Sequence, residues 1–202
     1  DGAMSTRKGN ILLLKDLIAE VKQRSLVLAQ EKSHGLSQTE LGELARVMGV
    51  GALKYNILSQ NRLSDITFSW DTMLSLEGNS APYVMYTAVR AHSLLSKAAG
   101  APESRDGNVL ESALGEQVER ELALWIAAYS SHLSLAAREY RPHTLANYLY
   151  TLSQKYNSLY GSLPILDAAE PDRTVRLQLA AAVHAVLVHG LGCLGIDVPN
   201  KM

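Results

Sequence analysis

The chain has 202 residues, of which 47% are hydrophobic and 19% charged, a composition typical of a folded globular protein rather than a disordered one. With 19 basic and 20 acidic residues the formal net charge is −1, so a nucleic-acid-binding surface has to be local. The single cysteine, Cys193, excludes a disulfide framework within the chain, and no apolar run approaches the roughly 20 residues that span a bilayer, so we expect no membrane association.

The first predicted element is a helix that follows a polar, glycine-containing loop at residues 1–10. Apolar residues recur at mostly helical spacing over residues 11–32. Ser37 and Glu40 then match the capping-box pattern, in which each side chain bonds the backbone of the other. A second helix is therefore predicted to begin here.

Two glycines and an apolar stretch divide the next part of the chain. Gly49 and Gly51 are expected to interrupt the second helix, so that residues 52–58 form another. Residues 66–70 alternate in polarity and are compatible with a strand, but they have no evident pairing partner. We expect Ile66, Phe68 and Trp70 to anchor an extended segment against helices.

The remaining elements are all predicted to be helical. Pro82 favours the first turn of a helix that continues over residues 83–99, and a Gly- and Pro-containing linker covers residues 100–108. Three further helical stretches follow, at residues 110–135, 143–160 and 173–194. The sequence thus predicts an all-α helix bundle with one short extended segment near residues 65–70.

The sequence gives little support for a metal site or for a catalytic nucleophile. His184 and His189 lie five residues apart, which misses the spacing that puts two ligands on one helix face, so no metal site is expected. Cys193 follows an apolar stretch and is interpreted as a small buried hydrophobe rather than a nucleophile. Nothing in the chain forms a complete catalytic site.

A window rich in tyrosine suggests RNA binding instead. It holds six of the nine tyrosines, at positions 129, 140, 148, 150, 156 and 160. Its only acid is Glu139, whereas Arg138, Arg141, Lys155 and His143 supply positive or potentially positive charge. Rings that stack on splayed bases and cations that meet phosphates are what single-stranded RNA requires.

Core packing is the competing interpretation. On a helical wheel Tyr156 falls within a leucine stripe and is expected in the core, while Tyr148 and Tyr160 lie at opposite edges of it. Asn157 and Tyr150 lie farther out. Tyr160 and Asn157 are therefore the better candidates to meet a ligand.

Several ordered blocks resemble arginyl-tRNA synthetases. Residues 4–10, Met-Ser-Thr-Arg-Lys-Gly-Asn, resemble the activation-loop signature of class I synthetases. Residues 65–71 and 76–86, with Arg90 and His92 after them, are similar to the opening of the helical DALR-type anticodon-binding domain. Matching blocks also occur later, around Tyr148, around Asn157 and at the end of the chain, residues 192–202.

The resemblance implies an ATP-dependent, AMP-forming arginine–tRNA ligase. Its partners would be arginine tRNA, L-arginine and ATP with magnesium, and it would be a monomeric cytoplasmic enzyme of protein synthesis. The tRNA-binding residues that it implies are Tyr83, Tyr86, Arg90, Tyr148, Asn157, Tyr160 and Met202. The activation-loop remnant that it implies is Met4, Ser5, Thr6, Arg7, Lys8 and Gly9.

Departures from the family limit what can be carried over. Ala3 and Thr6 stand where the general class I signature has lysines, so the lysine roles are not transferred. The nucleotide-binding domain and its signature do not occur in the sequence, so we expect this chain to need no cofactor and to bind tRNA without catalysing. It is interpreted as a piece cut from a ligase or a natural truncation, with a free-standing, non-catalytic tRNA- or partner-binding protein as the alternative.

The resemblance also suggests a division of the chain. Residues 1–10 would be the loop remnant, expected to be solvated and poorly packed without its catalytic partner. Residues 11–80 would form a helical connecting region, and residues 81–202 the anticodon-binding bundle. Within that bundle, inward packing of Tyr83 and Tyr86 is the alternative to RNA contact.

Overall fold

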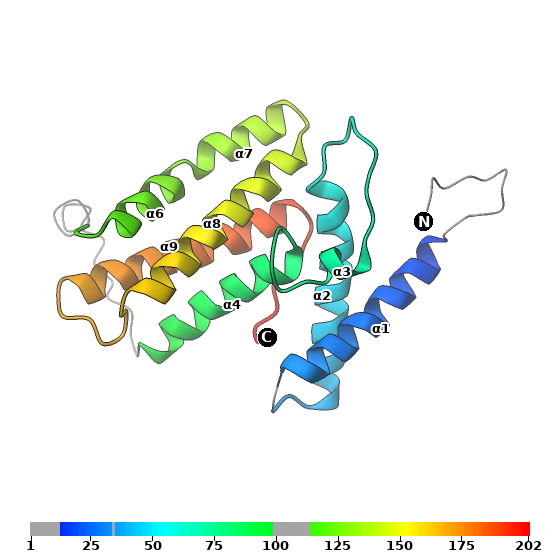
Figure 1. Cartoon of the computed structure of the whole chain (residues 1–202), viewed down its shortest axis with the longest axis horizontal. Helices are drawn as coiled ribbons and strands as arrows, with labels where there is room; N and C mark the ends of the chain where they lie inside the picture. The colour runs from blue at the N-terminus through cyan, green and yellow to red at the C-terminus, as the bar shows by residue number, and fades with distance from the viewer. Residues whose placement is uncertain (1–12, 34, 99–113) are drawn as a thin grey trace.

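The computed structural model describes residues 13–33, 35–98 and 114–202, and every regular element in these ranges is a helix, as predicted (Figure 1). The helices are α1 (Leu14–Lys32), α2 (Gln38–Leu58), α3 (Trp70–Met73), α4 (Ala81–Lys97), α6 (Gln117–Ala127), α7 (Tyr129–Arg138), α8 (Pro142–Ser162) and α9 (Asp172–Cys193). The proposed loop at residues 1–10 and the linker at residues 100–108 lie outside the described ranges.

The helices form a hairpin beside a bundle. α1 packs against α2, and these two cross the end of the bundle made by α4, α6, α7, α8 and α9 (Figure 1). α9 lies at the centre of the bundle and contacts α4, α6 and α8. The last residues leave α9 and return along α2, so the C-terminal tail joins the bundle to the hairpin.

The predicted capping box is confirmed. The Glu40 carboxylate accepts a hydrogen bond from the Ser37 backbone N–H at 2.8 Å, and the Glu40 N–H donates to the Ser37 hydroxyl at 3.3 Å. These reciprocal bonds satisfy donors that the first turn of a helix cannot pair internally. They place the start of α2 at the predicted residue.

The predicted break in α2 is wrong, because the helix runs unbroken through both glycines. A Cβ on Gly49 would lie 2.8 Å from the Ser25 hydroxyl of α1, and one on Gly51 would overlap the Met85 side chain of α4. These glycines let neighbouring helices approach closely instead of ending the helix.

The segment before α3 also differs from expectation. It forms no strand, and Ile66 is 50% exposed and therefore does not anchor it. Phe68 is partly exposed and meets Trp70 edge-to-face at 4.8 Å. Trp70 alone packs against the core, as the first residue of α3, with the Arg24 guanidinium of α1 over its ring at 4.8 Å.

The later helices follow the prediction with one division. The stretch predicted over residues 110–135 is two helices, α6 and α7, which meet at Ala128. α8 and α9 confirm the two other stretches, and Tyr156 is fully buried, as the wheel indicated. α9 is long and apolar enough, by length and composition alone, to span a membrane, although half of that apolar stretch is buried within the bundle.

Candidate nucleic-acid interface

An arginine that lies between two tyrosines marks the clearest candidate for a binding surface. The Arg90 guanidinium of α4 lies 4.7 Å from the ring centroid of Tyr86 and 4.9 Å from that of Tyr160 on α8. The quadrupole of each ring attracts the cation and fixes its plane. Tyr86 and Tyr160 are 37% and 41% exposed, so both rings remain open to a ligand.

The side chain of Asn157 sets the position of this arginine. Its Oδ1 accepts from Arg90 Nη1 at 2.7 Å, and its Nδ2 donates to the Tyr83 hydroxyl and to Thr87 Oγ1, both at 3.0 Å. One amide thus ties α8 to three positions of α4. The helical wheel made Asn157 a candidate to meet a ligand, whereas here both ends of its amide are occupied within the protein.

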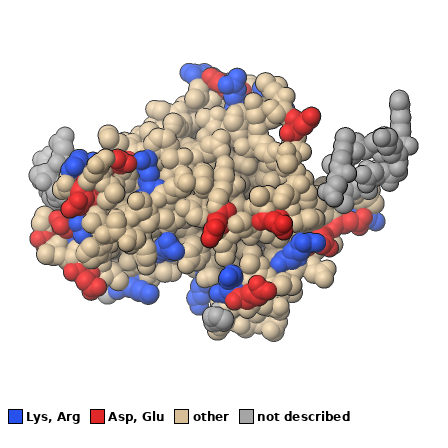
Figure 2. Space-filling model, viewed as in Figure 1, with Lys and Arg blue, Asp and Glu red and all other residues tan. Residues whose placement is uncertain are grey.

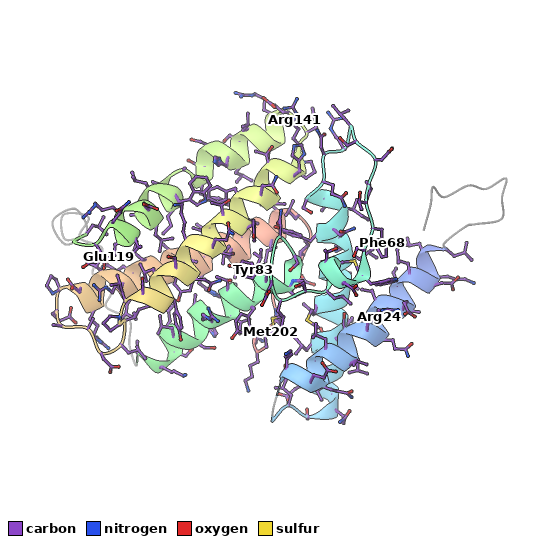
Figure 3. All side chains as sticks on the ribbon, in the orientation of Figure 1. Arg24, Phe68, Tyr83, Glu119, Arg141 and Met202 are labelled. Atoms are coloured by element: carbon purple, nitrogen blue, oxygen red, sulfur yellow. The ribbon has the colours of Figure 1, made fainter. Side chains whose placement is uncertain are left out.

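Tyr83 extends the surface along α4. Tyr83, labelled in Figure 3, is partly buried. Its ring meets that of Tyr150 at 5.6 Å in an edge-on arrangement between α4 and α8. The term Arg90 surface is used below for Tyr83, Tyr86, Arg90, Asn157 and Tyr160. The structure therefore brings together five of the seven residues that the family resemblance implied. Tyr150 was placed in the tyrosine-rich window but not among the residues implied to bind tRNA, and Thr87 was not predicted. Their contacts join α4 to α8, so the spacing within one helix does not reveal them.

Tyr156 packs in the core beneath this surface. It is fully buried, with its ring 6.1 Å from that of Tyr160. Its hydroxyl has no hydrogen-bond partner among the described residues. Burial raises the pKa of Tyr156 well above its usual range, the Tyr160 hydroxyl adds to this rise, and Arg90 opposes it. The phenol therefore stays neutral beside the cation.

Tyr148 belongs to the core rather than to this surface. It is 2% exposed, stacks on Trp125 at 5.5 Å, and donates its hydroxyl hydrogen bond to the Trp125 carbonyl at 2.8 Å. Burial raises the pKa of its phenol above the usual range. Helices α6 and α7 cover the edge of α8 that carries Tyr148, which the wheel of a single helix cannot reveal.

Met202 approaches the Arg90 surface from the C-terminal tail. It is partly buried and packs against both the bundle core and the small cluster between α1 and α2. Together with Tyr86 and Leu76 it lines a cavity of about 130 Å³. Met202 therefore lies beside one ring of the Arg90 surface, without forming part of the arginine sandwich.

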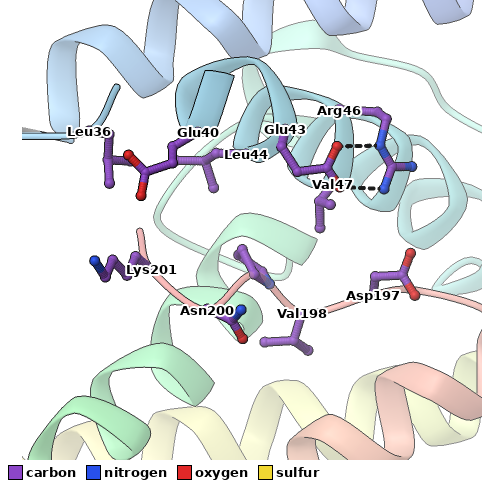
Figure 4. Close-up of a pocket in the computed structure, with 11 residues that line it drawn as sticks. Leu36, Glu40, Glu43, Leu44, Arg46, Val47, Asp197, Val198, Asn200 and Lys201 are labelled. Atoms are coloured by element: carbon purple, nitrogen blue, oxygen red, sulfur yellow. Dashed lines mark hydrogen bonds and ion pairs between the residues drawn. The ribbon is translucent and has the colours of Figure 1, made fainter. Parts of the chain in front are cut away.

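A larger pocket of about 420 Å³ lies between α2 and the C-terminal tail (Figure 4). Its wall includes the Glu43–Arg46 ion pair at 2.6 Å, together with Asp197 and Lys201. Charges of both signs and apolar residues share the wall, so it favours no single class of ligand. It is distinct from the Arg90 surface.

Charge is sparse on the face that carries α4 and α8. Figure 2 shows large uncharged areas on this face, with a few acidic and basic side chains near its centre and most of the others toward the rims. A ligand here would meet rings, amides and the Arg90 cation rather than a broad basic field. This pattern suits the bases of a splayed loop better than a regular duplex.

Three other predictions concern residues outside the Arg90 surface. Cys193 is exposed, contrary to expectation, because it faces outward at the end of α9, with its Sγ 3.8 Å from His189 Nδ1. No group of three metal-ligating side chains occurs in the part of the chain that the structure describes. The activation-loop remnant, Met4 to Gly9, lies outside the described residues.

Comparison with known proteins gives two family matches. Residues 84–202 match the DALR anticodon binding domain, and residues 1–70 match the catalytic domain of class I (R) tRNA synthetases. The arginine–tRNA ligase of Fusobacterium nucleatum is 41% identical over 202 residues, which are 100% of this chain and 35% of the relative. That of Proteus mirabilis is 38% identical, over 98% of this chain and 34% of the relative. The chain thus spans about a third of the length of these relatives.

Solved structures agree with this match. The Thermus thermophilus arginyl-tRNA synthetase superposes with a TM-score of 0.84 at 31% identity, covering 95% of this chain and 32% of the other. The Plasmodium falciparum arginyl-tRNA synthetase superposes with a TM-score of 0.83 at 26% identity, covering 95% of this chain and 34% of the other. The arrangement of hairpin and bundle is therefore shared with both.

Proposed function

The chain belongs to the DALR anticodon-binding domain family, and on this premise we propose that it is the tRNA-holding part of an arginine–tRNA ligase, with the anticodon loop received on the Arg90 surface. The whole ligase would join L-arginine to its tRNA at the expense of ATP with magnesium, as a monomeric cytoplasmic enzyme. This chain would supply binding rather than catalysis.

The observation that carries this proposal is the position of the Arg90 guanidinium, which contacts the rings of Tyr86 and Tyr160. Within the described residues it donates one hydrogen bond, to Asn157, which leaves other N–H donors for a phosphate or a base edge. Tyr86 and Tyr160 flank it with partly exposed rings on which an unstacked base can lie. Because these parts are already fixed by packing, little ordering entropy remains to be lost on binding.

The test is a titration of this chain with arginine tRNA and with an unrelated tRNA at several salt concentrations. Tyr160→Ala should lose roughly 1–3 kcal/mol of binding, the range for one stacked base. Arg90→Ala should weaken binding and lower the slope of log K against log salt by about 0.7–0.9, the loss of one phosphate contact. Lys22→Ala, which removes an exposed cation from α1, is the control.

Substitution of Asn157 tests whether this residue positions Arg90 or contacts a base itself. Asn157→Ala should weaken tRNA binding because both Arg90 and Tyr83 lose their shared partner. If Asn157 acts only through Arg90, this change should add little to the loss in an Arg90→Ala background. All variants must first keep the far-UV circular dichroism of the parent. A folded Tyr160→Ala variant that binds like the parent would remove Tyr160 from the interface.

The absence of catalysis is tested separately. We expect no ATP–pyrophosphate exchange from this chain alone, because the match to a catalytic domain is limited to residues 1–70. Sustained arginine-dependent exchange from a pure preparation would contradict this.

A further inference from the structure

A second group of basic and aromatic side chains lies at one end of the molecule, away from the Arg90 surface. Arg138 ends α7, Tyr140 and Arg141 lie in the turn before α8, and the loop after α2 brings Arg62 against this turn. Figure 3 labels Arg141 at this end of the molecule. These four residues are called the arginine tip below. All four are exposed.

Tyr140 adopts a conformation that a tyrosine rarely takes. Its φ is 53°, in the left-handed region where glycine and asparagine usually end helices. The turn is fixed by the hydrogen bond from Arg141 N–H to the Ala136 carbonyl at 2.9 Å and by Arg62 Nε, which donates to the Tyr140 carbonyl at 2.9 Å. The ring itself is 79% exposed, so packing does not explain a tyrosine at this position.

The charge of the tip is positive. Glu139 is the acid within the turn, and its carboxylate lies 3.0 Å from Arg141 and 4.0 Å from Arg138. Arg62 forms no ion pair among the described residues, and three guanidinium groups therefore face one carboxylate. Guanidinium groups and a tyrosine hydroxyl are the side chains that commonly donate to the phosphates of nucleic acids.

We propose that the arginine tip binds the sugar–phosphate backbone of the tRNA outside the anticodon loop, an inference that rests on the function proposed above. Tyr140 precedes Asn157 by 17 residues, and the rise of 1.5 Å per residue along α8 places them about 25 Å apart. A ligand that reaches both sites is longer than a loop. A folded RNA with a helical stem has that length and carries phosphates throughout.

The test compares whole arginine tRNA with a hairpin that contains only its anticodon loop and a short stem. The double variant Arg138→Ala/Arg141→Ala should bind whole tRNA roughly ten- to thirty-fold more weakly near 0.15 M salt, with a salt slope lower by about 1.4–1.8, as expected for two phosphates. Hairpin binding should be unchanged. Lys15→Ala/Lys22→Ala removes two exposed cations from α1 and is the charge-matched control.

Tyr140→Gly separates a structural role from a binding role. Glycine suits the left-handed turn better, so the thermal midpoint should stay or rise, whereas whole-tRNA binding should weaken. Tyr140→Asn, also tolerated in this region, provides a second variant should the glycine loosen the turn. A purely structural tyrosine would show the opposite, a lower midpoint with unchanged binding.

The possible results are distinguishable. If the parent chain binds no tRNA, the proposed function fails and this inference fails with it. If the parent binds but the arginine double variant behaves like the lysine control, the Arg90 surface stands and the tip has another partner, such as an acidic protein surface, which overturns the inference. Equal loss of hairpin and whole-tRNA binding also overturns it, because the tip would then act on the loop.

Discussion

The hairpin region, residues 13–69, and the bundle, residues 81–202, bury their apolar side chains to different extents. Seven of the twelve large hydrophobic side chains that are exposed in the described residues lie in the shorter hairpin region. They are Leu13, Leu14, Val27, Ile57, Leu63, Ile66 and Phe68, against Tyr86, Leu124, Tyr140, Tyr160 and Val188 in the bundle. Three of the five in the bundle are tyrosines that belong to the proposed RNA-binding surfaces.

The difference shows where the stability of the chain resides. The bundle encloses a continuous core and even a buried ion pair, Glu119–Arg176. The hairpin region contributes some residues to that core, namely Val21, Val47, Ala52, Leu53 and Tyr55. It also has a small separate cluster of Ala29, Leu41, Leu44 and Met48, and it depends on the close approach allowed by glycines in α2. The bundle can thus hold the Arg90 surface rigidly, whereas the hairpin contributes through its contacts with neighbours.

The strongest test of this comparison is the buried ion pair of the bundle. Arg176 Nε donates to Glu119 Oε1 at 2.7 Å, and the two side chains are 5% and 1% exposed. Glu119→Ala leaves a buried guanidinium short of its partner and should cost about 3–5 kcal/mol in urea unfolding. Glu121→Ala on the same helix removes an exposed ion pair with Lys155 of α8 and should cost much less, because solvent screens that pair. Similar costs for the two would show that the bundle interior tolerates the charge.

Trp70 tests the junction between the two regions. Its ring is half-buried, packs on the core and lies under Arg24. A fully buried tryptophan costs about 3–5 kcal/mol when cut to alanine, so Trp70→Ala should cost about 2–3 kcal/mol. Ile66→Ala, four residues earlier and half-exposed, should cost less than about 1 kcal/mol. A Trp70 value below that of Ile66 would place the ring outside the junction.

Two glycines of α2 test the hairpin, because replacing one by alanine should destabilise the chain and replacing the other should stabilise it. Gly49→Ala pushes a methyl group to within 2.8 Å of Ser25 Oγ and 3.1 Å of the Val21 carbonyl oxygen, and should cost about 1–3 kcal/mol. Gly42→Ala meets nothing within 4 Å and should stabilise the helix by up to about 1 kcal/mol. Thermal unfolding of both variants measures the difference. Two stabilising changes would mean that α1 does not approach α2 closely at Gly49.

These glycines also show what could be predicted from the sequence. The capping box of Ser37 and Glu40 was predictable because both partners lie within four residues. The continuity of α2 through Gly49 was not, since the reason for that glycine is Ser25 on another helix. Local signals therefore predicted the helices and the all-α class, whereas contacts between helices explain why glycines occur inside α2 without interrupting it.

The proposed binding surface also combines residues that the sequence placed correctly with residues that only the structure could place. The wheel of α8 correctly buried Tyr156 but gave Tyr148 and Tyr160 equivalent places at the edges of the stripe. Tyr148 is covered by α6 and α7, while Tyr160 meets Arg90. Family resemblance grouped Arg90 with Tyr160, but the amide of Asn157 that joins them required the structure. Exposure of Tyr140 likewise follows from a left-handed turn that spacing does not reveal.

The smallest expected effect concerns the capping box at the start of α2. Ser37→Ala removes the hydroxyl that accepts from the Glu40 N–H and should cost about 1 kcal/mol in urea unfolding.

The capping box also makes the stability of the chain depend on pH. Hydrogen bonds from the Ser37 backbone N–H and, second, from its hydroxyl lower the pKa of the Glu40 carboxyl below its usual value. A lowered folded-state pKa gives stability that is present above the unfolded pKa, near 4.5, and lost as the pH falls through the folded pKa. As the pH falls below the unfolded pKa and through the folded pKa, the parent should therefore lose more stability than Glu40→Gln, which cannot titrate. Ser37→Ala keeps the backbone donor and should fall between them. Identical acid profiles for the parent and Glu40→Gln would show that the capping box adds nothing to the hairpin beyond helix propensity.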